Sequence, residues 1–299
     1  MDTPIYEQPL SASRIDTLCC PYKFYLSYVL NLEPIEPPPE YLHAGSVGHI
    51  GVYHWHHSEQ DDTWALDCAQ EAWGDYTGRG EYLPDGTKNT YAYLTWEYVE
   101  DQVLRRYFNY YRDKINSVPV KLEVGGQTLE AEKRVQVTLP NGIEYVVLID
   151  YIHRENGTDK LIIDDFKLTT GNVGYALNGH SVSLQLRGYS QVLKQETGEL
   201  PRVRLNGVYM GKSKRTDEAA MQIQTFEYMD WSLDEFLQAA LYTKRELHWR
   251  SECQFWEQRA SKQNCSNCSF LKACQAGPRL RQGILDQDFR QKQRQGHGD

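Results

Sequence analysis

Two acidic side chains and a lysine follow apolar runs in the middle of this 299-residue chain. Asp150 comes directly after the run 145–149, and Asp165 and Lys167 come just after the run 161–163. A carboxylate at the end of such a run is costly to bury unless it is paired or bound to a cation. Two converging carboxylates can share a divalent cation, and a lysine beside them can position a water molecule or stabilise negative charge on a phosphate.

We expect the two runs to form a β-hairpin, because Asn156-Gly157 between them is a strong two-residue turn signal. With that turn, Asp150 lies opposite Ile163, and Asp165 is its diagonal neighbour, about 7–8 Å away between backbone positions. Side chains alternate along a strand, so Asp164 points to the other face. Replacement of Asp164 by alanine is therefore expected to reduce cleavage much less than replacement of Asp165 or Lys167.

The elements that must position these residues change along the chain. Apolar and aromatic residues at helical spacing predict helices over 11–31, 44–57, 183–196 and 233–250 and a helical region over 60–116. β-Branched residues between turn signals predict strands over 128–138, 143–152, 160–168 and 202–210. Strands that alternate with helices predict an α/β fold.

Five segments follow from this pattern. They are an N-terminal helix with a first cysteine over 1–32, a helical subdomain over 33–117, a core over 118–232, a C-terminal helix with clustered cysteines over 233–285, and a disordered tail over 286–299. The second segment opens with a proline-rich linker over 33–40, which no helix or central strand could contain.

Composition restricts the class of protein. With 40% hydrophobic and 24% charged residues the chain is globular, and no apolar run is long enough to span a membrane. The first ten residues do not read as a secretory signal, so we expect a cytoplasmic protein. The net charge of −9 argues against non-specific coating of nucleic acid but permits a local basic channel. The sequence Gly207-x3-Gly211-Lys212-Ser213 is one residue short of a phosphate-binding loop, so ATP binding is not expected.

Seven cysteines in such a chain favour metal ligation or free thiols over disulfides. Three of them form the pattern Cys265-x2-Cys268-x5-Cys274, and Cys19 and Cys20 lie near the start. Four thiolates suit a four-iron cluster or a zinc ion, and their spacing does not separate the two.

Three motifs resemble the RecB-like branch of the PD-(D/E)xK nucleases. They are Asp150 with Asp165-Phe166-Lys167, the upstream Gly45-x3-His49, and the downstream Gln185-x3-Tyr189. The resemblance implies a restriction-endonuclease-like α/β core, in which helices flank a mixed central sheet, with a helical insertion. It also implies that Gln185 and Tyr189, which share one face of a helix, orient the DNA strand.

The resemblance implies a role for each residue of the hairpin. His49, Asp150 and Asp165 would bind Mg²⁺ or Mn²⁺, and Lys167 would position the attacking water or stabilise the phosphate. Glu132 matches a semi-constant acid of the family, and the sequence leaves open whether it takes part in catalysis.

The N-terminal segment Cys20-Pro21-Tyr22-Lys23-Phe24 resembles the opening of the iron–sulfur RecB-like nucleases, which include CRISPR-associated RecB-like exonucleases and AddB-type subunits. The resemblance implies a 4Fe-4S cluster that joins the N- and C-terminal segments and is held by Cys20, Cys265, Cys268 and Cys274. Zinc is the alternative occupant, and Cys19 is the alternative to Cys20. We expect Cys68 and Cys253 to be buried thiols.

The function implied is that of a metal-dependent DNA exonuclease, which hydrolyses phosphodiester bonds in single strands or at duplex ends during recombination, repair or CRISPR adaptation. The net charge and the missing ATP motif favour a helicase or another recombination or CRISPR protein as partner. The alternative function is a DNA-end-binding subunit of a larger complex, with secondary or no cleavage. The complete set of acids, lysine and histidine disfavours that alternative.

Overall fold

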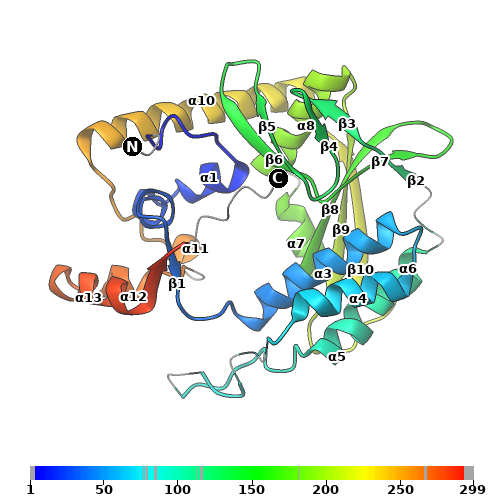
Figure 1. Ribbon diagram of the computed structural model, residues 1–299, viewed down its shortest axis with the longest axis horizontal. Helices are drawn as coiled ribbons and strands as arrows, with labels where there is room; N and C mark the ends of the chain where they lie inside the picture. Colours follow the sequence, from blue (N-terminus) through cyan, green and yellow to red (C-terminus); the bar gives the residue numbers. More distant parts are fainter. Residues whose placement is uncertain are drawn as a thin grey trace.

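The computed structural model describes residues 4–76, 78, 80–83, 86–112, 114, 117–180, 182–265 and 268–292. Its centre is a five-stranded sheet in the order β10-β9-β8-β7-β2 (Figure 1). The strands are β2 (Ser117–Pro119), β7 (Tyr151–Glu155), β8 (Leu161–Thr169), β9 (Arg202–Tyr209) and β10 (Met221–Glu227). Because β8 and β9 run parallel while the other neighbours are antiparallel, the sheet is mixed, which confirms the predicted architecture.

Helices flank this sheet (Figure 1). One group comprises α3 (Glu40–His57), α4 (Asp62–Trp73), α5 (Trp96–Val99), the π-helical turn η2 (Glu100–Arg105) and α6 (Arg106–Tyr111). The other comprises α7 (Val173–His180), α8 (Leu184–Thr197) and the long α10 (Asp230–Cys253), with the short α9 (Asp217–Ala220) leading into β10. Helix α3 begins directly after Pro39, four residues earlier than predicted, because a proline is tolerated just before the first turn of a helix.

Two glycines allow helices to approach the sheet closely. A Cβ atom at Gly48 of α3 would lie 2.3 Å from Leu168 of β8, and one at Gly207 of β9 would lie 2.3 Å from Val173 of α7. Helix α3 therefore packs on the face of β8 that carries Leu168, and α7 packs on the opposite face of the sheet.

The predicted strand 143–152 is divided in two. Its first part is β6 (Glu144–Leu148), which pairs with β5 (Arg134–Thr138), and its second part is β7, which joins the central sheet. A separate short hairpin contains β3 (Leu122–Val124) and β4 (Gln127–Leu129). The chain changes sheets at residues 149–150, so Asp150 lies at a bend between two strands.

The turn between β7 and β8 is longer than the two residues predicted. The Glu155 amide donates a hydrogen bond of 3.0 Å to the carbonyl of Lys160, so four residues, 156–159, form the loop. Asn156-Gly157 therefore marks a turn in the right place but not the two-residue type, and the pairing of the two strands shifts accordingly.

This shift changes the partners of the acids. Tyr151 pairs with Asp164, so Asp150, one residue earlier, lies at the level of Asp165. The predicted position opposite Ile163 is wrong by two residues. The shift keeps every side chain on its predicted face, because two residues are one full period of a strand.

The N- and C-terminal segments pack together in a second small core. Strand β1 (Leu32–Pro34) pairs antiparallel with β11 (Phe289–Gln291), and a hydrophobic cluster forms around the buried Leu26, Phe270 and Leu285. The short helices α11 (Lys262–Cys265), α12 (Leu271–Gln275) and α13 (Pro278–Asp288) complete this region. The predicted tail is wrong at its start, since residues 286–291 form the end of α13 and β11. Residues 293–299 lie outside the described part of the chain.

The predicted helix 11–31 is interrupted. It consists of α1 (Ala12–Thr17), α2 (Pro21–Phe24) and the π-helical turn η1 (Tyr25–Val29). Pro21 is the cause, because proline disfavours a helical conformation at the preceding residue, and Cys20 is extended. Among the described helices, none combines the length and apolar character that a membrane span needs.

Candidate active site

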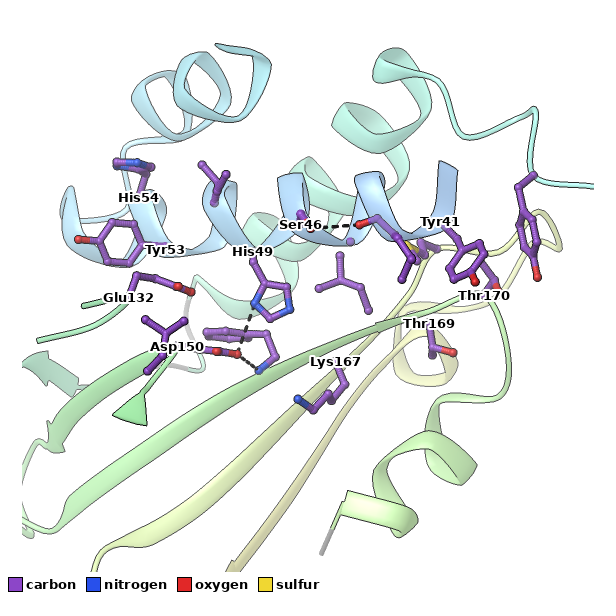
Figure 2. A pocket seen from close by; sticks show the side chains of 18 residues that line it. Tyr41, Ser46, His49, Tyr53, His54, Glu132, Asp150, Lys167, Thr169 and Thr170 are labelled. Atoms are coloured by element: carbon purple, nitrogen blue, oxygen red, sulfur yellow. Dashed lines mark hydrogen bonds and ion pairs between the residues drawn. The ribbon is translucent and has the colours of Figure 1, made fainter. Parts of the chain in front are cut away.

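A cavity of about 1040 Å³ lies between α3 and the second half of β8 (Figure 2). Strand β7 pairs with β8 only as far as Asp164, so β7 does not cover the edge of β8 beyond that residue. His49, Glu132, Asp150 and Lys167 all line the cavity. Four separate parts of the chain, namely α3, the loop before β5, the bend at residues 149–150 and β8, thus bring these side chains to one place.

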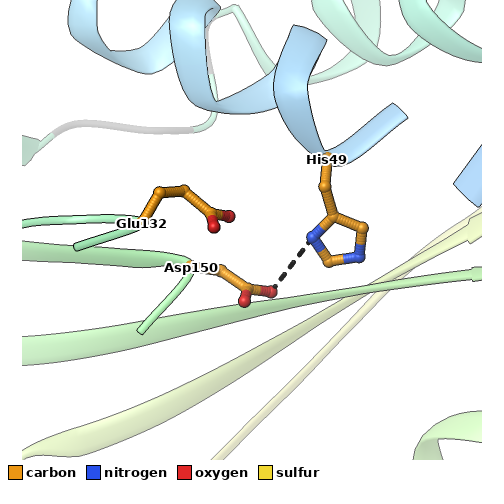
Figure 3. A group of neighbouring side chains, drawn as sticks. All are labelled: His49, Glu132 and Asp150. Atoms are coloured by element: carbon orange, nitrogen blue, oxygen red, sulfur yellow. Dashed lines mark ion pairs between the residues drawn. The ribbon is translucent and has the colours of Figure 1, made fainter. Parts of the chain in front are cut away.

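His49, Glu132 and Asp150 form a candidate metal site (Figure 3). One ligand atom from each lies within 4.8 Å of the other two, and His49 Nδ1 is 3.3 Å from Asp150 Oδ2. The Phe166 amide donates a hydrogen bond of 2.9 Å to the same Oδ2. Two carboxylates and an imidazole at this separation are a donor set that suits a divalent cation.

Asp165, the other acid predicted to bind the metal, belongs neither to this group nor to the side chains that line the cavity, and it is 1% exposed. Lys167 Nζ forms an ion pair with its Oδ2 at 2.7 Å. Within the described part of the chain, neither carboxylate oxygen accepts a hydrogen bond of good geometry. A buried carboxylate with so few partners is unfavourable, and a bound cation would supply the partner that the protein does not. The residues present therefore fit a divalent metal ion.

The charges of the cavity influence one another strongly. Burial, reinforced by the negative charge of Asp150, raises the pKa of Asp165 to about 6. Glu132 is an exposed residue, but partial loss of water around its carboxyl group and the charge of Asp150 raise its pKa to about 7. Burial acts in the same direction on Asp150, but the hydrogen bond and charge of His49 outweigh it and lower the pKa of that carboxyl. Two acids with raised pKa values beside an ionised one indicate an excess of negative charge, which a cation relieves.

Gln185 and Tyr189 lie close to the site but do not line the cavity. Gln185 Nε2 donates a hydrogen bond of 2.9 Å to the Tyr189 hydroxyl, which in turn donates to the backbone carbonyl of Leu148. Tyr189 is buried, and Leu148 is two residues before Asp150. The pair holds the bend that carries Asp150, whereas the resemblance implied contact with the DNA strand.

Sequence reasoning missed a buried polar network on the face of β8 that carries Leu168, opposite to Asp165 and Lys167. The fully buried Asp164 lies 2.7 Å from His153 Nε2, forms an ion pair with Arg204, and accepts a hydrogen bond of 2.8 Å from Asn206. Arg204 and Asn206 are two residues apart on β9, a spacing that places both on one face. The polar residues at alternate positions of β9 were the sequence signal that could have revealed this network.

The four cysteines predicted to act together line a second cavity, of about 450 Å³. They are Cys20, Cys265, Cys268 and Cys274. Burial and the neighbouring thiols Cys268 and Cys20 raise the pKa of Cys274 to about 11. Cys19 is exposed and donates to Asn264, and Cys253 is also exposed, so the prediction that Cys253 is buried is wrong. Cys68 is half-buried.

Three comparisons with known proteins bear on the family to which the chain belongs. A search of curated proteins found no match to the chain. A crystal structure of a protein from Eubacterium rectale, named as a candidate exonuclease, aligns with 91% of this chain and 90% of its own, at 11% sequence identity and a TM-score of 0.46. The family model of the PD-(D/E)XK nuclease superfamily matches residues 9–275, a range that contains His49, Asp150 and Lys167. The chain belongs to the PD-(D/E)XK nuclease superfamily.

Proposed function

We propose that this protein is a metal-dependent DNA exonuclease of the RecB-like iron–sulfur type, acting on single strands or duplex ends. One observation carries the proposal: His49, Glu132 and Asp150 bring their ligand atoms within 4.8 Å of one another in a cavity that Lys167 also lines. The buried Asp165 lies next to Phe166, whose amide binds Asp150, and forms an ion pair with Lys167.

A divalent cation held by Asp150, Asp165, His49 and Glu132 would polarise the scissile phosphate and lower the pKa of a bound water. The protein's own contribution is positional. Lys167 Nζ, anchored by Asp165 at 2.7 Å, would donate a hydrogen bond to the attacking water or to a phosphate oxygen. The Phe166 amide fixes the Asp150 carboxylate, so the acid need not reorganise when substrate binds.

The cysteine cavity supports a 4Fe-4S cluster as the second cofactor. Cys20, Cys265, Cys268 and Cys274 line one cavity, although they come from both ends of the chain. Four thiolates suit such a cluster, and the resemblance of the segment Cys20-Pro21-Tyr22-Lys23-Phe24 to the iron–sulfur nucleases favours it over a zinc ion.

The biological setting proposed is cytoplasmic recombination, repair or CRISPR adaptation, with a helicase or another protein of these pathways as partner. The net charge of −9 supports a partner that delivers DNA to the cavity.

The test of this function is cleavage of end-labelled single-stranded and duplex DNA by the purified protein with Mg²⁺ or Mn²⁺. We expect loss of label from the ends, inhibition by a chelator, and no cleavage by Asp150→Asn. If the wild-type protein binds DNA ends but cleaves nothing with either metal, the end-binding function replaces the nuclease.

A further inference from the structure

Gly45 is the one cavity-lining glycine of α3 in the described chain, and its own surroundings do not account for it. Glycine inside a helix is destabilising relative to alanine. At Gly48 and Gly51 the reason is close packing, since a Cβ atom would lie 2.3 Å from Leu168 and 2.7 Å from Leu104. At Gly45 no described atom comes within 4 Å of such a Cβ. The missing side chain therefore leaves space for something outside the chain.

The position of Gly45 indicates what passes over it. Four residues of α3 at intervals of four line the cavity and form a stripe about 18 Å long on the helix. They are Tyr41, Gly45, His49 and Tyr53. Figure 2 shows Tyr41 towards one end of this stripe, Tyr53 towards the other, and His49 between them pointing at Asp150. Gly45 thus leaves a space without a side chain between Tyr41 and the metal site at His49.

The aromatic end of the stripe is a pair of rings. The centroids of Tyr41 and Tyr91 are 4.9 Å apart, and both side chains line the cavity and are only half-buried. Exposed aromatic rings bind unstacked bases of any sequence, because every base has a π face. Between this pair and Tyr53, α3 approaches the bend of the chain at the 3.3 Å contact between His49 and Asp150.

We propose that a single DNA strand crosses α3 at Gly45, with one base against Tyr41 and Tyr91 and a neighbouring phosphate at His49 and Asp150. This inference rests on the proposed function and deepens it, since it assigns single strands, including strands frayed from duplex ends, as the substrate that reaches the metal. A base inside a duplex has both π faces covered by its neighbours in the stack, so it cannot pack against the tyrosines until it is unpaired.

The experiment replaces Gly45 by leucine in the full-length protein and measures affinity for a fluorescein-labelled oligothymidine by anisotropy, together with its cleavage. The matched control is Gly283→Leu, since Gly283 is also a helical glycine with no described atom within 4 Å of its Cβ position, and it lies in α13 away from the cavity. We expect Gly45→Leu to weaken strand binding and raise KM by about tenfold or more, while its affinity for Mn²⁺ is unchanged. Gly283→Leu should behave as the wild type.

A second pair of variants covers the case in which Gly45→Leu does not fold. Tyr41→Ala should weaken binding of the strand by about 5- to 100-fold, whereas Tyr41→Phe, which keeps the ring, should retain it. Wild-type strand binding by Gly45→Leu, or equal losses in both Tyr41 variants, would overturn the inference, and so would a wild-type protein that binds no single strand. If the wild type binds but does not cleave, a loss of binding in Gly45→Leu supports the strand path while the proposed nuclease function fails.

Discussion

The backbone amide of Phe166 donates its hydrogen bond to the carboxylate of Asp150, at 2.9 Å. In a continuous hairpin that amide would bond to a carbonyl of the neighbouring strand, but the chain bends away before it reaches this level. A side chain therefore takes over the role of a backbone partner. The same contact satisfies the open edge of β8 and fixes the direction of a metal ligand.

Replacement of Asp165 by alanine should reduce cleavage by about 10²–10³-fold or more, because the lysine and the cation lose a shared partner. The protein should remain folded, since removal of a buried carboxylate with few partners relieves a desolvation cost. Cleavage of labelled DNA and thermal denaturation test both parts. The exposed Asp234→Ala is the control, and near-normal cleavage by Asp165→Ala would place the active site elsewhere.

Asp164→Ala should destabilise the folded protein, whereas Asp165→Ala should not. It leaves the largely buried Arg204 without its carboxylate, which we expect to cost about 3–5 kcal/mol of unfolding free energy. The sequence-based expectation of a mild effect considered only the direction of the side chain and not what it meets. Urea denaturation measures the loss, and a stability equal to wild type would show that the Asp164 network contributes nothing.

Without metal, the stability of the protein should fall as the pH rises from about 4 towards about 7. The pKa values of Asp165 and Glu132 are raised on folding to about 6 and about 7, so the folded state binds more protons than the unfolded state in that range. Their contribution is complete below the unfolded pKa values, near 4, and is lost above the folded ones. Thermal melts in a chelator should show a flatter pH profile for Asp165→Asn, and Mn²⁺ should stabilise the wild type most at neutral pH.

Tyr189→Phe should lower kcat about fivefold with little change in KM, because the lost hydrogen bond, worth about 1 kcal/mol, holds the Leu148 carbonyl and not the substrate. The exposed Tyr175→Phe is the matched control. A rise in KM at constant kcat would indicate instead that Tyr189 contacts DNA, as the resemblance implied.

Protein purified without oxygen should be brown and contain about four iron atoms per chain. Cys268→Ala should lose the colour and become unstable, since metal binding to ligands at both ends of the chain contributes to folding. Cys68→Ala and Cys253→Ala should keep both colour and stability. A colourless protein with one zinc ion would reject the cluster while leaving the nuclease intact.

The strand faces were predictable from alternation alone, and they place Asp165 and Lys167 together and Asp164 opposite. The pairing register of β7 and β8 was not predictable, because it depends on the length of the loop between them, which the Asn156-Gly157 signal does not determine. The position of Asp150 at a bend was also hidden, since an apolar run reads the same whether it remains in one sheet or passes to another.

Contacts between residues far apart in the sequence were the second feature that could not be predicted. Pro21 gave a local reason for the break in the first helix, which a reading by apolar spacing overlooks. The pairing of Arg204 with Asp164 links residues 40 apart, and nothing in their neighbourhoods specifies it. The grouping of Cys20 with three distant cysteines followed from the family resemblance and not from spacing.

The pairing of β1 with β11 also determines when the terminal region of the protein can fold during translation. Glu33 and its partner Arg290 are 257 residues apart. At about 5–20 residues per second on the ribosome, the N-terminal strand waits roughly 13–50 s before its partner is made. During that time its apolar neighbours, such as Leu26, have no second half of their core. The terminal region can therefore be completed only after all strands of the central sheet have been synthesised.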